Sequence, residues 1–366
     1  MNYSFKMPVN IYQEEECIRK HKNIFGECGK RAFIVTGKHS AKACGALKDI
    51  TDVLKDENIE YEIFDNIENN PSLENVTEAS LKAKKFKSDF IIGIGGGSPL
   101  DASKAISVLA ANDIEPLEIF KMNFTKAYPI VAVPTTSGTG SEATPYSVLL
   151  RKDLNTKISF GNNYTFAKYA LLDPKYTMSL SRSITVNTAV DAFTHSLEGY
   201  LSNRATEISD ALALEAIRKF GECFKDLVDG NMNMEIREKL IYVSMLGGMV
   251  ITNTGVTIVH GMGYCYTYFK EIPHGRANGL LVKNYLKYIY DTKKRKIDKV
   301  LILLNCRSID ELGGYIEKLL GAAPNLTDEE IDNYTKLTLI QKGSIINTAK
   351  KLTEEDIKML WSNNRI

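Results

Sequence analysis

Short β-branched runs alternate with amphipathic segments through the first half of the chain, and this alternation limits the fold more than any other feature. Four runs are the clearest, at residues 32–37 (AFIVTG), 61–65 (YEIFD), 90–95 (FIIGIG) and 129–136 (PIVAVPTT). Strands separated by helical segments are typical of β-α-β units, which build a parallel sheet. Two more strand-like pieces, SVLLRK and KYALLDP, follow. The sequence therefore predicts an α/β domain with a parallel sheet.

The pattern changes after Asp173-Pro174 to long helical stretches such as NTAVDAFTHSLEGYLS and SDALALEAIRKFGECFKDLV. Apolar residues recur there at spacings of three and four, as on one face of a helix. A chain of 366 residues also exceeds the size at which one hydrophobic core usually stops growing. We therefore predict an α/β domain over 1–180 and an all-α domain over 181–366. The last helix is expected at TEEDIKMLW, with Thr353 as its N-cap.

Composition and charge exclude several classes of function. With 46 basic and 45 acidic side chains the net charge is +1, so no overall field favours nucleic acid or an anionic membrane. The N-terminus lacks the pattern of a signal peptide, and no run of 18 apolar residues occurs. The six cysteines form no C-x-x-C pair, which favours reduced thiols. We expect a cytoplasmic protein that acts on small molecules.

A glycine-rich junction joins the run at 90–95 to the helical segment that follows it. The sequence GIGGGSPLDASKAI contains Gly95, Gly96, Gly97 and Ser98. Glycines let backbone N–H groups face an anion without interference from a Cβ, and the start of a helix adds partial positive charge. The junction therefore predicts a pyrophosphate site, although it departs from the G-x-G-x-x-G fingerprint at Ser98. The alternative is a turn that needs glycine only for tight packing.

A second loop, PTTSGTGSEAT at 134–144, also leaves a strand and is rich in hydroxyl side chains. Ligands of open α/β sheets bind outside the carboxyl ends of the strands. We therefore expect the two loops to converge and to hold opposite sides of one dinucleotide. Taken alone, a loop rich in serine and threonine would indicate only local turn chemistry.

Three of the five histidines lie in the helical half of the chain. Asp191 and His195 are four residues apart, so on a helix they share one face and can hold one ion. His260 and His274 are each followed by glycine, which is consistent with close approach of helix ends or loops. One carboxylate and three imidazoles suit Fe²⁺, and Zn²⁺ or another divalent cation also fits. Each histidine taken singly could instead be a hydrogen-bonded structural residue.

Taken together, these segments resemble the iron-containing (group III) alcohol dehydrogenase family over essentially the whole chain. The segments GGGSPLDASKA, PTTSGTGSE, D-A-x-x-H, H-G-M and I-P-H-G-x-A-N occur in the family's order and approximate spacing. The resemblance implies a Rossmann-like N-terminal domain with a parallel sheet and an all-α C-terminal domain. This is the architecture of iron alcohol dehydrogenases and of dehydroquinate synthase, with the cofactor and the metal in the intervening cleft.

The resemblance also implies roles for particular residues. The metal ligands would be Asp191, His195, His260 and His274. The residues along the cofactor would be Gly96, Gly97, Ser98, Asp101, Thr135, Thr136, Thr139, Lys157, Asn70 and Leu180. Several relatives carry a histidine four residues after the ligand that matches His260, where this chain has Tyr264. We count His274 and Tyr264 as the catalytic candidates; the Tyr264 hydroxyl could relay the proton, or water could have taken that role.

The turn after the first predicted strand bears on which nicotinamide cofactor is used. Family members with an aspartate there tend to use NAD, because a carboxylate binds the ribose hydroxyls and repels a 2′-phosphate. Here the turn contains Gly37, Lys38 and Ser40, so a cation and a hydroxyl could bind the 2′-phosphate. We therefore predict NADP(H) in preference to NAD(H). The alternative is that Lys38 is a solvated lysine at a loop tip.

The sequence thus predicts a metal-dependent oxidoreductase that moves hydride between NAD(P)(H) and a small primary alcohol, diol or aldehyde, as a homodimer. One alternative is a lyase related to dehydroquinate synthase, which would need a strongly basic pocket; near the ligands the sequence offers chiefly Arg276. Another is a non-catalytic nucleotide-binding sensor. The substrate itself is not specified by the sequence.

Overall fold

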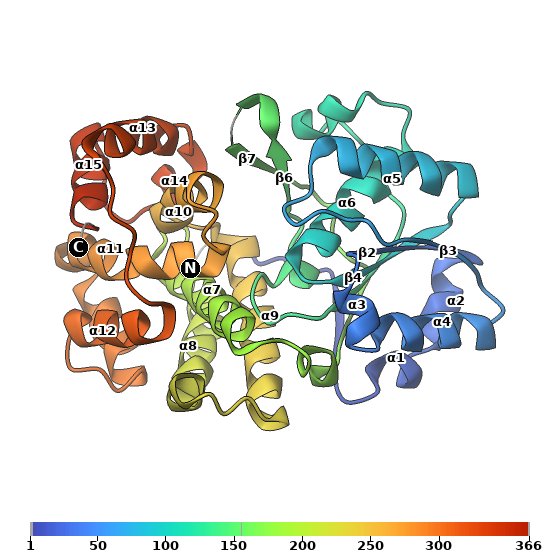
Figure 1. Ribbon diagram of the computed structural model, residues 1–366, viewed down its shortest axis with the longest axis horizontal. Coiled ribbons are helices and arrows are strands. Elements are labelled where there is room, and N and C mark those ends of the chain that lie inside the picture. The colour runs from blue at the N-terminus through green and yellow to red at the C-terminus, as the bar shows by residue number, and fades with distance from the viewer. Residues whose placement is uncertain (1–2, 155, 365–366) are drawn as a thin grey trace. The chain divides into compact units, whose positions relative to one another are not determined.

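The computed structural model describes residues 3–154 and 156–364, which form two compact units (Figure 1). The α/β unit comprises Met7–Leu180 and Asn233–Ile241. The helical unit comprises Ser181–Met232 and the described parts of Met1–Lys6 and Tyr242–Ile366. Two short segments cross the single boundary that the sequence predicts: the described part of Met1–Lys6 joins the helical unit, and Asn233–Ile241 joins the α/β unit.

The α/β unit is built on six parallel strands in the order β1-β8-β5-β4-β2-β3. The strands are β1 (Asn10–Gln13), β2 (Arg31–Thr36), β3 (Glu60–Phe64), β4 (Phe90–Gly95), β5 (Ile130–Pro134) and β8 (Tyr169–Leu172). In the register of the sheet, Thr36 pairs with Ile94 and Gly95 pairs with Pro134. The carboxyl ends of β2, β4 and β5 therefore meet at one edge, as the sequence predicts for its loops.

Three strands differ from the sequence interpretation, which predicts no strand over 10–13 or 156–160. The run SVLLRK lies in β6 (Ser147–Arg151), which pairs with β7 (Thr156–Phe160) in a separate antiparallel hairpin outside the main sheet. The sequence does not predict β1, because only two of its four residues, NIYQ, are hydrophobic and the strand lies at the edge of the sheet with a partner on one side only.

Helices cover both faces of the sheet, with α5 and α6 on one side and α1 to α4 on the other (Figure 1). The side of α1 to α4 is an apolar layer in which Ile34 and Ile92 of the strands pack with Ile50 and Leu54 of α4. The helices of this unit are α1 (Cys17–Lys20), α2 (Asn23–Cys28), α3 (Ser40–Ala43), α4 (Ala46–Asp56), α5 (Leu73–Phe86) and α6 (Gly97–Ala111), with 3₁₀ turns η1 (Pro116–Lys121), η2 (Ser141–Ala143), η3 (Lys152–Leu154) and η4 (Pro174–Thr177).

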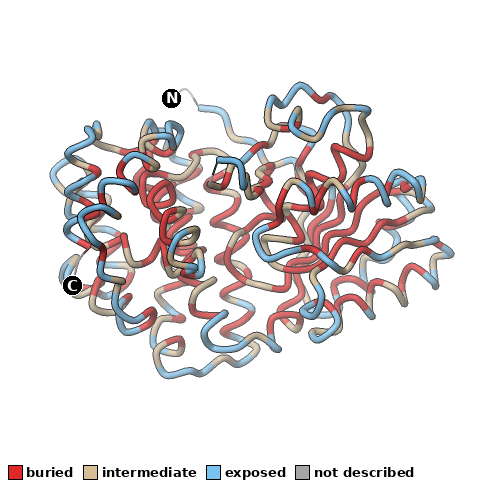
Figure 2. The backbone as a smooth tube through the Cα atoms, turned by 45° about the horizontal axis from the view of Figure 1, so that its top comes forward, coloured by how far each residue is buried: buried red, intermediate tan, exposed pale blue. Residues whose placement is uncertain are grey.

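The helical unit is organised around α7 (Arg182–Leu201), which is buried along most of its length (Figure 2). Its first turn is capped by the Ser181 hydroxyl, which accepts from the Ile184 amide. The other helices of this unit are α8 (Glu207–Asp229), α10 (Ile258–Phe269), α11 (His274–Leu303), α12 (Ile309–Leu320), α13 (Asp328–Leu339), α14 (Lys342–Asn347) and α15 (Glu354–Ser362). Helix α9 (Met234–Thr254) is divided, because its residues up to Ile241 belong to the α/β unit and the rest to the helical unit. Thr353 caps α15, as predicted. No single helix among the described residues has the length and apolar composition to cross a membrane; only α9 and α10 taken together, with a bend of 116°, do.

Candidate metal centre and cofactor cradle

Helices α7 and α10 bring three of the four predicted metal ligands together. Asp191 and His195 lie one turn apart on α7, and His260 lies in the first turn of α10. Each offers a ligand atom, and these atoms all lie within 4.8 Å of one another. The rings of His195 and His260 stack with their centroids 4.6 Å apart. All three side chains are buried, so the group forms a preassembled set of one carboxylate and two imidazoles.

The chemistry of this group fits a divalent cation. The Nε2 atom of His260 is buried without a hydrogen-bond partner and lies 3.8 Å from Oδ1 of Asp191. A buried nitrogen of this kind is costly unless it binds something. Burial would raise the pKa of Asp191, but the neighbouring imidazoles, with His195 foremost, outweigh burial and hold that pKa below its ordinary value. Asp191 is therefore a carboxylate at neutral pH, ready to bind a cation.

His274 lies beside the group at the first residue of α11. Its ring centroid is 5.3 Å from that of His260, but its nitrogens are not among the atoms within 4.8 Å of one another. The Asn278 amide, one turn further along α11, donates to Oδ1 of Asp191 over 3.1 Å and lies 3.3 Å from Nε2 of His274. Asn278 thus connects the fourth predicted ligand to the other three.

Tyr264 lies one turn after His260 on α10, where the family resemblance puts the proton relay. Its ring stacks on that of His274, with centroids 5.5 Å apart and the planes 10° from parallel. The side chain is partly exposed. The stacking joins the two catalytic candidates in space, and their catalytic roles stay predictions.

The two predicted loops of the α/β unit are in contact, as expected. A Cβ built on Gly96 would lie 3.0 Å from Oγ1 of Thr136, and one built on Gly97 would lie 2.7 Å from Cγ2 of Thr139. Any side chain at either glycine would therefore fill the space between the loops. The same glycines begin α6, whose N-terminal amides attract anions. This cradle fits the pyrophosphate of a dinucleotide, and we call Gly96, Gly97, Thr136 and Thr139 the cradle below.

Other predicted cofactor residues are connected to the cradle through Ser98, which directly follows Gly97. The backbone amide of Asn70 donates to the Ser98 hydroxyl over 3.1 Å, and the Lys157 ammonium donates to Oδ1 of Asn70 over 2.7 Å. Asn70 has a φ of 58°, a left-handed conformation that asparagine tolerates better than most residues. Thr135 has a buried hydroxyl without a partner at this same edge. Ser98 and Thr135 follow from the two loop sequences, whereas Asn70 and Lys157 are predicted only through the family resemblance.

The remaining predicted cofactor residues lie outside these hydrogen bonds. Gly37, Lys38 and Ser40 follow β2 next to the strand that leads into the cradle, and Lys38 and Ser40 are exposed. Leu180 follows η4, where its carbonyl accepts from Arg237 over 3.0 Å. Among the described residues, no hydrogen bond joins these four residues to the cradle.

Asp101 has a more specific environment than predicted. Its carboxylate accepts from the Ser141 hydroxyl over 2.5 Å and from the Val148 amide over 2.9 Å, so it joins α6 to the second loop. Beside it lies Lys104, which the sequence analysis missed. Lys104 is buried and donates to the Ser141 hydroxyl over 2.7 Å and to the Tyr146 carbonyl over 2.6 Å. The sequence signal that could have identified Lys104 is its position one turn after Asp101, on a helix that begins at the glycine-rich junction.

A second missed residue is Glu198, in the last turn of α7. It is fully buried, and its carboxylate contacts the imidazole of His260. Its spacing was the signal that could have found it, because it follows Asp191 by seven residues and His195 by three and so shares their helix face.

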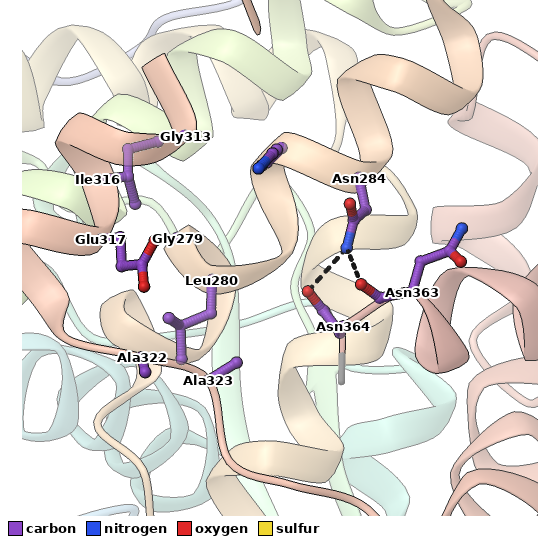
Figure 3. A pocket seen from close by; sticks show the side chains of 11 residues that line it. Gly279, Leu280, Asn284, Gly313, Ile316, Glu317, Ala322, Ala323, Asn363 and Asn364 are labelled. Atoms are coloured by element: carbon purple, nitrogen blue, oxygen red, sulfur yellow. Dashed lines mark hydrogen bonds between the residues drawn. The ribbon is translucent and has the colours of Figure 1, made fainter. Parts of the chain in front are cut away.

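The helical unit also contains a hollow of about 220 Å³ between α11, α12 and the C-terminal segment (Figure 3). On its wall the Asn284 amide donates to the Asn363 carbonyl and to Oδ1 of Asn364, each over 3.0 Å. None of the described residues that line it is a predicted site residue. The hollow is therefore separate from the metal ligands.

Comparison with known proteins agrees with this geometry. The family described as "Iron-containing alcohol dehydrogenase" matches residues 8–174, and the family described as "Fe-containing alcohol dehydrogenase family, C-terminal" matches residues 185–364. A sulfoacetaldehyde reductase of Bilophila wadsworthia is 36% identical over 68% of this chain and 65% of its own length. An NADPH-dependent butanol dehydrogenase of Clostridium saccharobutylicum is 28% identical over 89% of this chain and 82% of its own length.

The solved structures lead to the same family. The crystal structure of an iron-containing alcohol dehydrogenase from Thermotoga maritima has a TM-score of 0.92 and 36% identity, covering 99% of both chains. The chain therefore belongs to the iron-containing alcohol dehydrogenase family and is an NAD(P)-linked oxidoreductase of that family. The predicted fold, an α/β unit with a parallel sheet and a helical unit, is confirmed.

Proposed function

We propose that this enzyme transfers hydride between NADP(H) and a small primary alcohol, diol or aldehyde, with Asp191, His195, His260 and His274 as ligands of one divalent cation. The observation that supports it most strongly is the buried group of Asp191, His195 and His260 with an unpartnered Nε2 on His260. Fe²⁺ is the first choice and Zn²⁺ the second, since this ligand set binds both.

The residues of the chain would divide the chemistry as follows. When bound, the cation supplies Lewis acidity that lowers the pKa of a coordinated alcohol, and the nicotinamide accepts or donates the hydride. Asn278 holds Asp191 and His274 in place by its amide hydrogens. Tyr264, a partly exposed residue whose ring stacks on His274, would exchange a proton with solvent through its hydroxyl. The cradle would bind the pyrophosphate with the backbone amides of α6.

The preference for NADP(H) rests on charge at the carboxyl end of β2. Lys38 and Ser40 are exposed there and available to a 2′-phosphate. The first residue after β3 is the acidic Asp65, and its carboxylate pairs with the Lys42 ammonium at 2.5 Å, so its negative charge is compensated. The butanol dehydrogenase of Clostridium saccharobutylicum is also NADPH-dependent by name.

The two alternatives have less support. A lyase like dehydroquinate synthase would need a basic pocket for its substrate, yet Arg276 donates to the Ala322 carbonyl over 3.1 Å. A sensor without turnover would not require the buried ligand set. A homodimer stays a prediction, which light scattering of the purified protein would check.

The test is absorbance at 340 nm with protein stripped of metal and reconstituted with Fe²⁺ or Zn²⁺, offered NADPH or NADH and short aldehydes. We expect metal-dependent oxidation of NADPH that is lost in His260→Ala and His274→Ala, and retained in the control His21→Ala, because His21 pairs with Glu14 and belongs to neither proposed site. If bound metal and cofactor gave no turnover with any aldehyde, the lyase or the sensor would replace this proposal.

A further inference from the structure

Glu198 is a fully buried carboxylate on the same face of α7 as two of the proposed metal ligands. A buried charge is stable only when donors surround it. Within the described part of the chain, the donors to Glu198 come from the beginning of α10, the helix that carries His260. The carboxylate therefore lies between the two helices that make the metal group.

Its two oxygens have different partners. Oε1 accepts from the backbone amide of Thr257 over 2.9 Å and from the Thr257 hydroxyl over 2.6 Å, while the His260 amide lies 3.4 Å away. Oε2 contacts Nδ1 of His260. Thr257 is the N-cap residue of α10, but its hydroxyl makes no cap within its own helix. Glu198 takes over that capping role and adds a negative charge at the positive end of α10.

The contact with Nδ1 also determines which nitrogen of His260 carries the proton. A carboxylate accepts hydrogen bonds and does not donate them, so Nδ1 must hold a hydrogen. In the neutral ring Nε2 is then the nitrogen with the free lone pair. That atom has no partner and lies 3.8 Å from Oδ1 of Asp191. The carboxylate thus directs the lone pair of His260 into the ligand group.

We propose that Glu198 is a positioning residue that sets the tautomer and the orientation of His260 for metal binding. The proposal rests on the metal site of the proposed function and goes beyond it by assigning a residue that holds no metal itself. A carboxylate behind a ligating imidazole also raises its basicity, and loss of such a partner typically weakens metal binding 10- to 100-fold.

Glu198→Gln is the sharpest variant because it changes no shape. The backbone amide of Thr257 can only donate, so the single side-chain oxygen of the glutamine must occupy the Oε1 position. The NH₂ group of glutamine must then face Nδ1 of His260 and donate to it. This reverses the tautomer and puts a hydrogen on Nε2, where the metal would bind. With His260 neutral, the substitution leaves no uncompensated buried charge, and the glutamine amide keeps its partners on Thr257 and His260.

Two measurements test this without relying on turnover. The first is the dissociation constant of Co²⁺, from its visible absorption bands and from competition with a chelator. We expect about 10- to 100-fold weaker binding and altered bands in Glu198→Gln. The second is a long-range ¹H–¹⁵N spectrum of the metal-free protein, in which the His260 signals, assigned with His260→Ala, change from the Nδ1–H to the Nε2–H form.

Val250→Ala is the control, since the buried side chain of Val250 on α9 packs against Gly199, the residue after Glu198 on α7, and has no polar atom to bond the carboxylate. It should lower the thermal unfolding midpoint and leave both readouts at their wild-type values. If Glu198→Gln bound Co²⁺ like the wild type and kept the Nδ1–H tautomer, the positioning role would be overturned. If instead the wild type bound no Co²⁺ at this group, the metal site of the proposed function would fail, independently of the tautomer result.

Discussion

Gly275 lies against the backbone of Asn187: a Cβ built on Gly275 would be 1.9 Å from the Asn187 carbonyl oxygen, and 2.7 Å from Cβ of Asp191. The contact joins the beginning of α11 to the turn of α7 that carries a proposed metal ligand. Because Gly275 directly follows His274, the absence of its side chain is what lets His274 approach the ligand group.

Gly275→Ala should therefore separate α11 from α7 and weaken metal binding at least tenfold. A backbone oxygen cannot move aside as a side chain can, so the helix start must shift and carry His274 with it. The measurement is the Co²⁺ dissociation constant together with the thermal unfolding midpoint. Gly314→Ala is the control, because a Cβ there meets nothing within 4 Å and should stabilise α12 by about 0.5–1 kcal/mol. Unchanged metal affinity in Gly275→Ala would contradict the role given to this contact.

The sequence predicts the strands and helices well where the hydrophobic pattern is long or where glycines or capping residues mark its ends. Strand β4 and its glycine junction, the face of α7 with Asp191 and His195, and the cap at Thr353 are all found where expected. Each rests on a local rule: an apolar run, a spacing of four residues, a capping box. Short and polar β1 has no such signal.

The missed residues depend on distant partners. Glu198 and Lys104 look like ordinary charged positions in the sequence, since Thr257 is 59 residues from the first and Ser141 is 37 residues from the second. A single sequence contains no measure of such distances. The glycine-rich junction and the hydroxyl-rich loop follow from local sequence, but the catalytic roles and the cofactor roles of Asn70, Lys157 and Leu180 rest on the family resemblance, because such side chains are common for local reasons.

Lys104→Met should weaken cofactor binding and destabilise the α/β unit. The ammonium joins α6 to the second loop, and its removal takes away the cation that lies 3.6 Å from the Asp101 carboxylate, which is only 14% exposed. Breaking a buried ion pair in this way typically costs about 3–5 kcal/mol. Urea unfolding and quenching of NADPH fluorescence measure the two effects. Lys48→Met, on an exposed lysine of α4, should change stability by no more than about 0.5 kcal/mol; an equal effect of both substitutions would argue against the bridge.

Glu142→Gln should remove part of the pH dependence of stability. Burial raises the pKa of Glu142 to about 7 from an ordinary value of 4.5, and the charged group that faces it is Lys104. Between these two values the folded protein binds more protons than the unfolded chain, so this contribution to the free energy of unfolding falls as pH rises. A shift of this size corresponds to a loss on the order of 3 kcal/mol by pH 8.

The measurement is urea unfolding of wild type and Glu142→Gln from pH 5 to pH 8. The glutamine is neutral throughout, so the variant should gain stability relative to wild type as pH rises, and the two should converge near pH 5. Curves that stay parallel over this range would mean that Glu142 does not titrate as a buried acid.

Tyr264→Phe should lower kcat at least tenfold if the hydroxyl relays the proton, because a positioned acid or base typically contributes about 10²- to 10⁴-fold. The phenylalanine keeps the ring that stacks on His274, so Co²⁺ affinity should not change. Tyr264→Ala removes ring and hydroxyl together and should reduce both. Steady-state kinetics with the Co²⁺ titration separate these effects. Wild-type turnover in Tyr264→Phe would assign the relay to water.

Lys38→Asp should reverse the cofactor preference. In the wild type the exposed ammonium would pair with the 2′-phosphate, and a charge-assisted bond of this kind is worth about 1.5–3 kcal/mol, roughly 10- to 150-fold in kcat/KM. An aspartate repels the phosphate and offers its oxygens to the ribose hydroxyls of NADH instead.

We therefore expect the ratio of kcat/KM for NADPH over NADH to fall at least tenfold in Lys38→Asp. Lys85→Asp, in the last turn of α5 ahead of the opposite edge of the sheet, changes the net charge equally. Lys85→Asp should leave the ratio unaltered, which distinguishes a local contact from an effect of net charge. If Lys38→Asp also left the ratio unaltered, Lys38 would be a solvated lysine, and other residues would determine the cofactor preference.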